Sequence, residues 1–128
     1  KNFILNDEFI ENHDLINYFE KSSLVVLPYT DATQSGIIPM AYKFKKPVVV
    51  TDVGSFRDTV EDGKTGIIVP PGDPQKLASA IIELLDNPKK RTEMGLAGHQ
   101  KLINELSWES IAKRTNAVYR QILGLTND

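Results

Sequence analysis

Short, uninterrupted apolar runs constrain the fold of this chain of 128 residues more than any other feature of its sequence. Three of them, residues 24–28, 47–51 and 66–70, contain Leu-Val-Val-Leu, Val-Val-Val and Ile-Ile-Val without any alternation of polar residues. Continuous β-branched runs of this length are typical of strands that are buried on both faces of a parallel sheet. A fourth apolar run at residues 2–5 extends the pattern, so we expect a parallel sheet of about four strands.

Segments with helical spacing separate these runs. Asp14 is suited to cap a helix whose apolar positions at 15–19 share one face. Apolar residues at 37–44 recur at intervals of three and four, and Ser55 with Asp58 resembles a capping box that opens a short helix. This alternation predicts an α/β fold, a doubly wound sheet with right-handed crossovers and helices on both faces.

The second half of the chain, residues 71–128, lacks strand signals and is predicted to be a helical C-terminal segment. Asp73 and Asn87 are each followed by proline, the pattern of a helix N-cap, and Ser107 caps a last helix that stops at Gly124. We expect the apolar positions of that last helix to face inward. They are Ile111, Thr115, Val118, Tyr119 and Ile122.

Composition and length limit the function classes. Hydrophobic residues at 41% and charged residues at 25% are typical of a globular protein, and the length suits one domain over residues 1–128, with its alternating part at 1–70. The absence of cysteine excludes disulfides, thiolate metal sites and cysteine nucleophiles. A net charge of -2 disfavours nucleic acid as a partner. Without a membrane-length apolar run or a signal-like start, a cytoplasmic location is expected.

The loop after the first continuous run is the strongest candidate for a ligand site, because ligands of parallel sheets bind beyond the carboxyl ends of strands. Proline is tolerated only in the first helical turn, so Pro39 requires the next helix to begin near Ser35 and Gly36. The free N–H groups of Gly36, Ile37 and Ile38 would then form an anion site suited to a phosphate or diphosphate. In the alternative interpretation, Ser35 is only a helix cap and Gly36 only a turn residue.

No metal, cofactor or nucleophile–base pair is indicated by the sequence. His13 and His99 are isolated and lack the spacing of metal ligands. Gly-x-Gly-x-x-Gly, Walker and Gly-x-Ser-x-Gly patterns are absent.

The order of the motifs carries a resemblance to a known family. A strand ending in proline and a Gly-led helix occupy residues 27–37, and Pro-Val-Val and Val-Gly follow at 47–54. Residues 60–70 continue with Asp-Gly-Lys-Thr-Gly before Ile-Ile-Val-Pro. This order resembles the donor-binding half of the GT-B-fold retaining glycosyltransferases of family 4, the glycosyl transferases group 1. The resemblance implies a Rossmann-like domain of an enzyme that moves a sugar from a nucleotide-diphosphate sugar to an acceptor, with retention.

The resemblance also implies roles for particular residues. The amides of Gly36 and Ile37 would hold the diphosphate of the sugar donor. Two glutamates that the family usually carries, eight positions apart, would fall at Ala32 and Met40, neither of which is acidic. Asp31 is then the candidate for the catalytic contact that the first glutamate makes, and some branches of the family carry a Thr-Gln-Ser-Gly loop. The implied substrate-binding residues are Thr33, Gln34, Ser35, Gly36, Ile37 and Met40.

Comparison with the family further predicts that this is a partial domain. The family's donor domain begins with two strands that precede residues 2–5, and an N-terminal acceptor domain precedes both. We therefore expect turnover, acceptor binding and any membrane association to require that N-terminal domain of the same enzyme. Without the two strands, the edge of the 24–28 strand would pair either with residues 2–5 or with a second copy, and we favour a homodimer.

Two other functions stay open at this point. A receiver-like signalling domain also has Pro-Val-Val-Val-Thr on a late strand, but it needs an aspartate at the end of its third strand, and Asp31 lies too far along. A non-catalytic nucleotide-sugar binding module would account for the absence of both glutamates. Calorimetry with nucleoside diphosphates would support the transferase or the binding module, and beryllofluoride binding would support the receiver.

Overall fold

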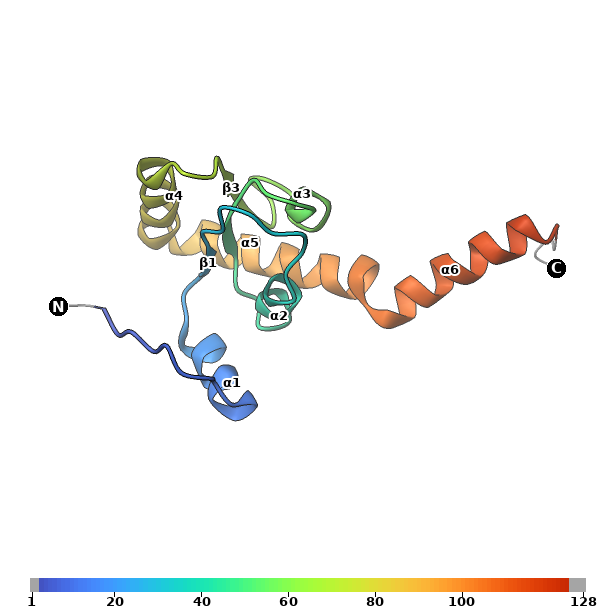
Figure 1. Ribbon diagram of the computed structural model, residues 1–128, viewed down its shortest axis with the longest axis horizontal. Coiled ribbons are helices and arrows are strands. Elements are labelled where there is room, and N and C mark those ends of the chain that lie inside the picture. The colour runs from blue at the N-terminus through green and yellow to red at the C-terminus, as the bar shows by residue number, and fades with distance from the viewer. Residues whose placement is uncertain (1–2, 125–128) are drawn as a thin grey trace.

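The computed structural model describes residues 3–124 (Figure 1). Three parallel strands, β1 (Val25–Leu27), β2 (Val48–Thr51) and β3 (Gly66–Val69), form one sheet in the order β1-β2-β3. The helices are α1 (Asn12–Lys21), α2 (Ile37–Lys43), α3 (Phe56–Thr59), α4 (Pro74–Asp86), α5 (Pro88–Lys101) and α6 (Trp108–Ile122), with the π-helical turn η1 (Leu102–Leu106) between the last two. The predicted α/β class is confirmed.

The central strand β2 shows why the continuous apolar runs form this sheet. All four of its residues are buried, and alternate side chains enter two different clusters, as the pleat of a strand requires. Val48 and Val50 pack on one face with residues of α1, α2 and α3. Val49 packs on the other face with Leu84 of α4 and Met94 of α5. Helices therefore cover both faces, as the sequence predicts.

The strand predicted at residues 2–5 is absent from the described residues, and Asn2 lies outside them. Phe3, Ile4 and Leu5 form no regular structure and are 96%, 95% and 89% exposed. No strand among residues 3–124 pairs with the outer edge of β1, so the sheet has three strands rather than about four. A strand needs a hydrogen-bonding neighbour, and hydrophobicity at 3–5 does not provide one.

Helix boundaries follow the capping signals where a side chain reaches the backbone. Asp73, Asn87 and Ser107 accept hydrogen bonds from the N–H groups three residues on, at 2.9, 3.0 and 3.2 Å, which confirms all three predicted caps. Asp14 is not a cap, because α1 begins two residues earlier and Glu11 occupies its N-cap position without a side-chain bond.

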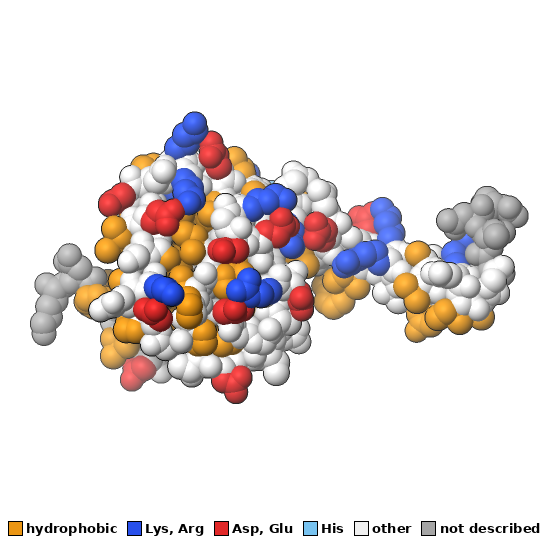
Figure 2. All heavy atoms as spheres, turned by 90° about the horizontal axis from the view of Figure 1, so that it is seen from above, with side chains coloured by type: hydrophobic (Ala, Val, Ile, Leu, Met, Phe, Trp, Pro, Cys, Tyr) orange, Lys and Arg blue, Asp and Glu red, His pale blue; other side chains and the backbone are white. Residues whose placement is uncertain are grey.

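The last helix departs from its predicted packing. α6 projects away from the body of the molecule, and its apolar side chains lie exposed along it (Figures 1 and 2). None of its residues is buried, including those predicted to face inward, and Val118, Tyr119 and Ile122 are well exposed. The amphipathic spacing identifies the helix, but the neighbour that such a face requires is not part of residues 3–124. None of the helices in this range combines the length and apolar character that crossing a membrane requires.

Candidate functional site

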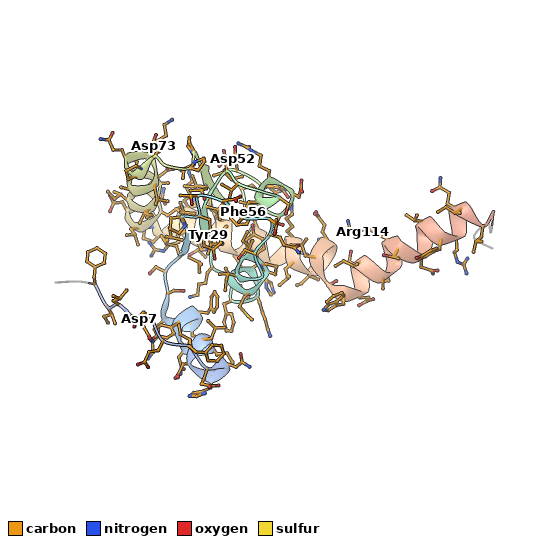
Figure 3. All side chains as sticks on the ribbon, in the orientation of Figure 1. Asp7, Tyr29, Asp52, Phe56, Asp73 and Arg114 are labelled. Carbon is orange, nitrogen blue, oxygen red and sulfur yellow. The ribbon has the colours of Figure 1, made fainter. Side chains whose placement is uncertain are left out.

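The candidate loop leaves β1 and crosses the carboxyl end of the sheet before α2 begins. The buried hydroxyl of Thr51, at the end of β2, donates to the carbonyl oxygens of Leu27 and Tyr29 and so holds the start of the loop against the neighbouring strand. The ring of Tyr29 lies 5.9 Å from that of Phe56 and is tilted against it by 51° (Figure 3). The loop is thus anchored over the strand ends, where ligands of parallel sheets bind.

A second loop, between β2 and α3, is fastened to the first. The backbone N–H and the hydroxyl of Ser55 both donate to the carbonyl oxygen of Thr33, at 2.9 and 2.8 Å. The capping box predicted at Ser55 and Asp58 is therefore wrong, because the serine hydroxyl is used between loops rather than within the helix. Gly54 has a φ of +51°, and a Cβ there would lie 2.1 Å from the carbonyl oxygen of Ala32. Only glycine permits this approach.

A cavity of about 460 Å³ opens where the two loops meet the start of α2. Gln34, Ser35 and Gly36, all predicted site residues, line it together with Ser55 and Pro39. Its remaining wall comes from α3 and the junction of η1 with α6, through Phe56, Thr59, Leu106, Trp108 and Ile111. The structure thus brings together the middle of the predicted motif, and adds residues from beyond position 100 that sequence spacing gave no means of placing there.

The start of α2 agrees with the position that Pro39 requires, but its amides differ in availability. The helix begins at Ile37, and the N–H of Ile37 donates to the hydroxyl oxygen of Ser35 at 3.2 Å, so this amide is not free as predicted. The N–H groups of Gly36 and Ile38 have no hydrogen-bond partner among residues 3–124. A Cβ on Gly36 would meet nothing within 4 Å, so the space on that side of its backbone is open.

The two positions expected for the family glutamates contribute to the packing of the core. Ala32 and Met40 are both partly buried and pack against the core cluster of α2 and α3. Met40 lies one turn into the helix, where its N–H donates to the carbonyl oxygen of Gly36 at 3.4 Å. Asp31, the candidate catalytic residue, is exposed and has no ion-pair partner within the described residues. Its exposed position allows contact with a ligand outside the loop.

One ion pair at the carboxyl ends of the strands was not predicted from the sequence. Both carboxylate oxygens of Asp52 accept hydrogen bonds from the guanidinium of Arg57, each at 2.7 Å. The hydrogen bond to Arg57 holds the pKa of Asp52 below its ordinary value. Two donor nitrogens of Arg57, Nε and one terminal nitrogen, are therefore engaged by Asp52. The sequence places these residues five apart on a loop and a short helix, and that spacing by itself predicts no contact.

The sequence of the chain is similar to those of known proteins. The family model of the glycosyl transferases group 1 matches residues 3–87. Alpha-maltose-1-phosphate synthase of Mycolicibacterium smegmatis is 29% identical over 121 residues, which cover 90% of this chain and 31% of that protein. The chain therefore spans about a third of this curated relative.

Solved structures show the same partial overlap. Sucrose-phosphate synthase from Thermosynechococcus elongatus superposes with a TM-score of 0.78 at 28% identity, over 91% of this chain and 29% of that one. Anabaena Alr3699/HepE in complex with UDP has a TM-score of 0.76 at 21% identity, over 84% and 30%, which shows a shared fold. Because the family model covers well over half of its length, the chain belongs to the glycosyl transferases group 1 family.

Proposed function

We propose that this chain forms the donor-binding part of a glycosyltransferase that moves a sugar from a nucleotide-diphosphate sugar to an acceptor. The observation that carries the proposal is the cavity of about 460 Å³ at the carboxyl ends of the parallel strands, walled by Gln34, Ser35 and Gly36. The named relatives support the reaction class, since they include a maltose-1-phosphate synthase and a sucrose-phosphate synthase. A protein of the same fold binds UDP.

Within this site, the diphosphate of the donor is proposed to lie against the start of α2. The unpartnered N–H groups of Gly36 and Ile38 are donors for its oxygens, and Gly36 leaves the space that an approaching oxyanion needs. Thr33 and Gln34 continue the loop toward the sugar, with Asp31 as the acidic residue nearest to it along the chain. The interlocked loops hold this geometry before the donor arrives, which lowers the entropy cost of binding.

In the proposed transfer with retention, the sugar donor itself supplies the group that accepts a proton. Because no nucleophile–base pair lines the cavity among the described residues, a phosphate oxygen of the leaving nucleoside diphosphate is proposed to accept the acceptor's proton. Because the chain spans 31% of a curated relative, acceptor binding and turnover are proposed to require protein segments beyond these 128 residues. A non-catalytic binding module is the second candidate, because Ala32 and Met40 occupy the positions of the family's usual glutamates. Nothing in the fold or in its relatives favours a receiver domain.

The substitution Gly36→Val tests the donor site in the full-length protein. The added side chain enters open space, so folding is expected to be unchanged while the phosphate is crowded. Calorimetry with UDP, GDP and ADP should show affinity reduced about tenfold or more, which corresponds to ~1.4 kcal/mol. Ala78→Val, at an exposed position of α4, is the matched control. Unchanged affinity for all three nucleotides in a folded Gly36→Val variant would show that the site is misplaced.

A further inference from the structure

A second cavity, of about 280 Å³, lies at the amino ends of the strands, whereas the proposed donor site lies at their carboxyl ends. Ser23 precedes β1 and Lys46 precedes β2, so the cavity opens at the amino ends of these strands. The residues that give it chemical character are hydroxyls and cations: Ser22, Ser23, Lys45, Lys46, Arg91 and Thr92. Within residues 3–124, no acidic side chain lines it.

The fold assembles this cavity from two basic runs that are far apart in sequence. One is Lys-Phe-Lys-Lys at 43–46, which begins at the last residue of α2, and the other is Lys-Lys-Arg at 89–91, in the first turn of α5. Close packing of α5 on the end of α2 joins them, since a Cβ on Gly95 would lie 2.1 Å from the carbonyl oxygen of Lys45. Lys45 itself is held in the left-handed region, at a φ of +56°, with its N–H bonded to Tyr42. The position of the lysine pair is therefore fixed by backbone contacts.

The cations around the cavity differ from most others in the described part of the chain. Lys64, Lys76 and Lys101 each have a carboxylate within ion-pair distance. Lys45 and Lys46 have none among residues 3–124, and neither does Arg91. A concentration of positive charge that is not balanced within the described fold favours an anionic ligand.

The polar contacts of these side chains orient them without neutralising them. Lys46 donates from Nζ to the carbonyl oxygen of Glu20 at 3.1 Å. One terminal nitrogen of Arg91 donates to the carbonyl oxygens of Leu84 and Leu85, both at 2.9 Å, which leaves the other guanidinium donors available. The hydroxyl of Ser23 has no hydrogen-bond partner within the described residues and can donate to a ligand. Both charged and neutral hydrogen-bond donors therefore line this cavity.

We propose that this cavity binds a phosphate group, as inorganic phosphate or as a phosphate monoester, independently of the sugar donor. Arg91 supplies the planar donors that fit two phosphate oxygens, and Lys45 and Lys46 supply the charge that a dianion requires. The second ionisation of a phosphate monoester occurs near pH 6, so binding strengthens as the pH rises through about 6. A headgroup of an anionic lipid and a free phosphate offer the same chemistry to these residues.

The test measures binding of radiolabelled inorganic phosphate to the full-length protein by equilibrium dialysis at low salt. The double variant Lys45→Gln/Lys46→Gln should bind phosphate about tenfold more weakly or worse, because it loses two charge-assisted contacts. Lys76→Gln/Lys113→Gln removes the same charge from exposed positions outside the cavity and should bind as wild type does. No saturable binding by the wild type, or an equal loss in both variants, would overturn the proposal.

Competition separates this site from the donor site. Saturating UDP should leave the bound phosphate in place, because the two cavities lie at opposite ends of the strands. Displacement of all the phosphate by UDP would place it in the donor site and refute the second site, whereas failure of UDP to bind bears only on the proposed function.

Sedimentation with vesicles then identifies the source of the phosphate. Vesicles with phosphatidic acid, a monoester, that bind the wild type and not Lys45→Gln/Lys46→Gln support a lipid headgroup. Retention of inorganic phosphate without vesicle binding supports a free phosphate. The double variant could instead sediment with the vesicles as the wild type does and also bind phosphate as the wild type does. The cavity would then have no role in vesicle binding or in phosphate binding.

Discussion

Ser55 donates both its backbone N–H and its hydroxyl to a single acceptor, the carbonyl oxygen of Thr33. This pair of bonds joins the loop after β1 to the loop after β2 at the edge where the donor is proposed to bind. The neighbouring Gly54 tightens the junction, because its backbone approaches Ala32 more closely than any side chain allows. The two loops are therefore expected to behave as one rigid unit, whose loss would affect folding and donor affinity together.

The change Gly54→Ala tests this junction. Its Cβ would lie 2.1 Å from the Ala32 carbonyl oxygen, and its φ of +51° adds left-handed strain, so the free energy of unfolding should fall by about 3 kcal/mol or more. Gly63→Ala is the matched control, since Gly63 also has a positive φ, of +77°, but its Cβ would meet nothing within 4 Å. It should lose only about 1–2 kcal/mol, the cost of the left-handed backbone alone. Urea unfolding measures both, and equal losses would contradict the close approach.

Local signals predicted much of this fold because the forces behind them are local. A strand buried on both faces carries apolar side chains at successive positions, and the Val-Val-Val run within Val48–Thr51 shows this pattern. A cap needs one side-chain oxygen three residues before an N–H, as at Asp73 and Asn87. In contrast, residues 3–5 and the apolar face of α6 require a partner surface, and neither hydrophobicity nor helical spacing says whether that partner is present.

The start of the helix at the candidate site could be predicted from the sequence, whereas the contacts of its residues could not. Pro39 correctly placed the start of α2, because the ring of proline excludes it from later turns. The bond from the N–H of Ile37 to Ser35 and the pairing of Asp52 with Arg57 depend on side-chain rotamers, which no spacing rule specifies. Contributions from η1 and α6 to the cavity wall are tertiary and join positions about seventy residues apart.

The buried phenol of Tyr42 is expected to make the stability of the fold sensitive to alkaline pH. Its ring is fully buried against Gly98, its hydroxyl lies 2.7 Å from the Thr65 Oγ1, and burial raises its pKa to about 12 from an ordinary value of 10.0. A raised pKa stabilises the neutral folded form below pH 10, and this contribution is lost as the pH rises toward 12. The free energy of unfolding should therefore fall by roughly 2–3 kcal/mol over this interval.

Stability measured by urea unfolding at several pH values isolates this effect. Tyr42→Phe lacks the titrating group, so its stability should decline less than that of the wild type between pH 10 and 12. Tyr119→Phe removes an exposed phenol and should retain the wild-type slope. Identical slopes in wild type and Tyr42→Phe would show that the buried hydroxyl does not control the alkaline limit.

Met40 tests the alignment with the family's ribose-binding glutamate. Because the side chain is only partly buried, a carboxylate in Met40→Glu is expected to reach solvent or the ribose, with a stability loss below about 2 kcal/mol. Calorimetry should show a gain in affinity for nucleoside diphosphates. A loss of several kcal/mol without such a gain would mean that Met40 serves the core with which it packs.

The outer edge of β1 makes association of two copies the expected state of the 128-residue chain. Its backbone groups have no strand partner among residues 3–124, and a groove of about 400 Å³, lined by Leu15, Phe19, Leu24 and Val25, runs between β1 and α1. Unpaired apolar edges recruit another strand, and a two-fold symmetric dimer satisfies both copies at once. Light scattering at ~100 μM, within the concentration range where exposed edges associate, should therefore give the mass of a dimer.

Two lysine substitutions decide which surface holds such a dimer. Val26→Lys places a charge on the edge strand and should return the chain to a monomer, because a charged edge resists pairing. Val118→Lys places the same charge on the exposed face of α6 and should leave the dimer intact. The reverse result would assign the interface to α6, whose apolar side chains are also uncovered. A wild-type chain that scatters as a clean monomer at ~100 μM would refute association through either surface.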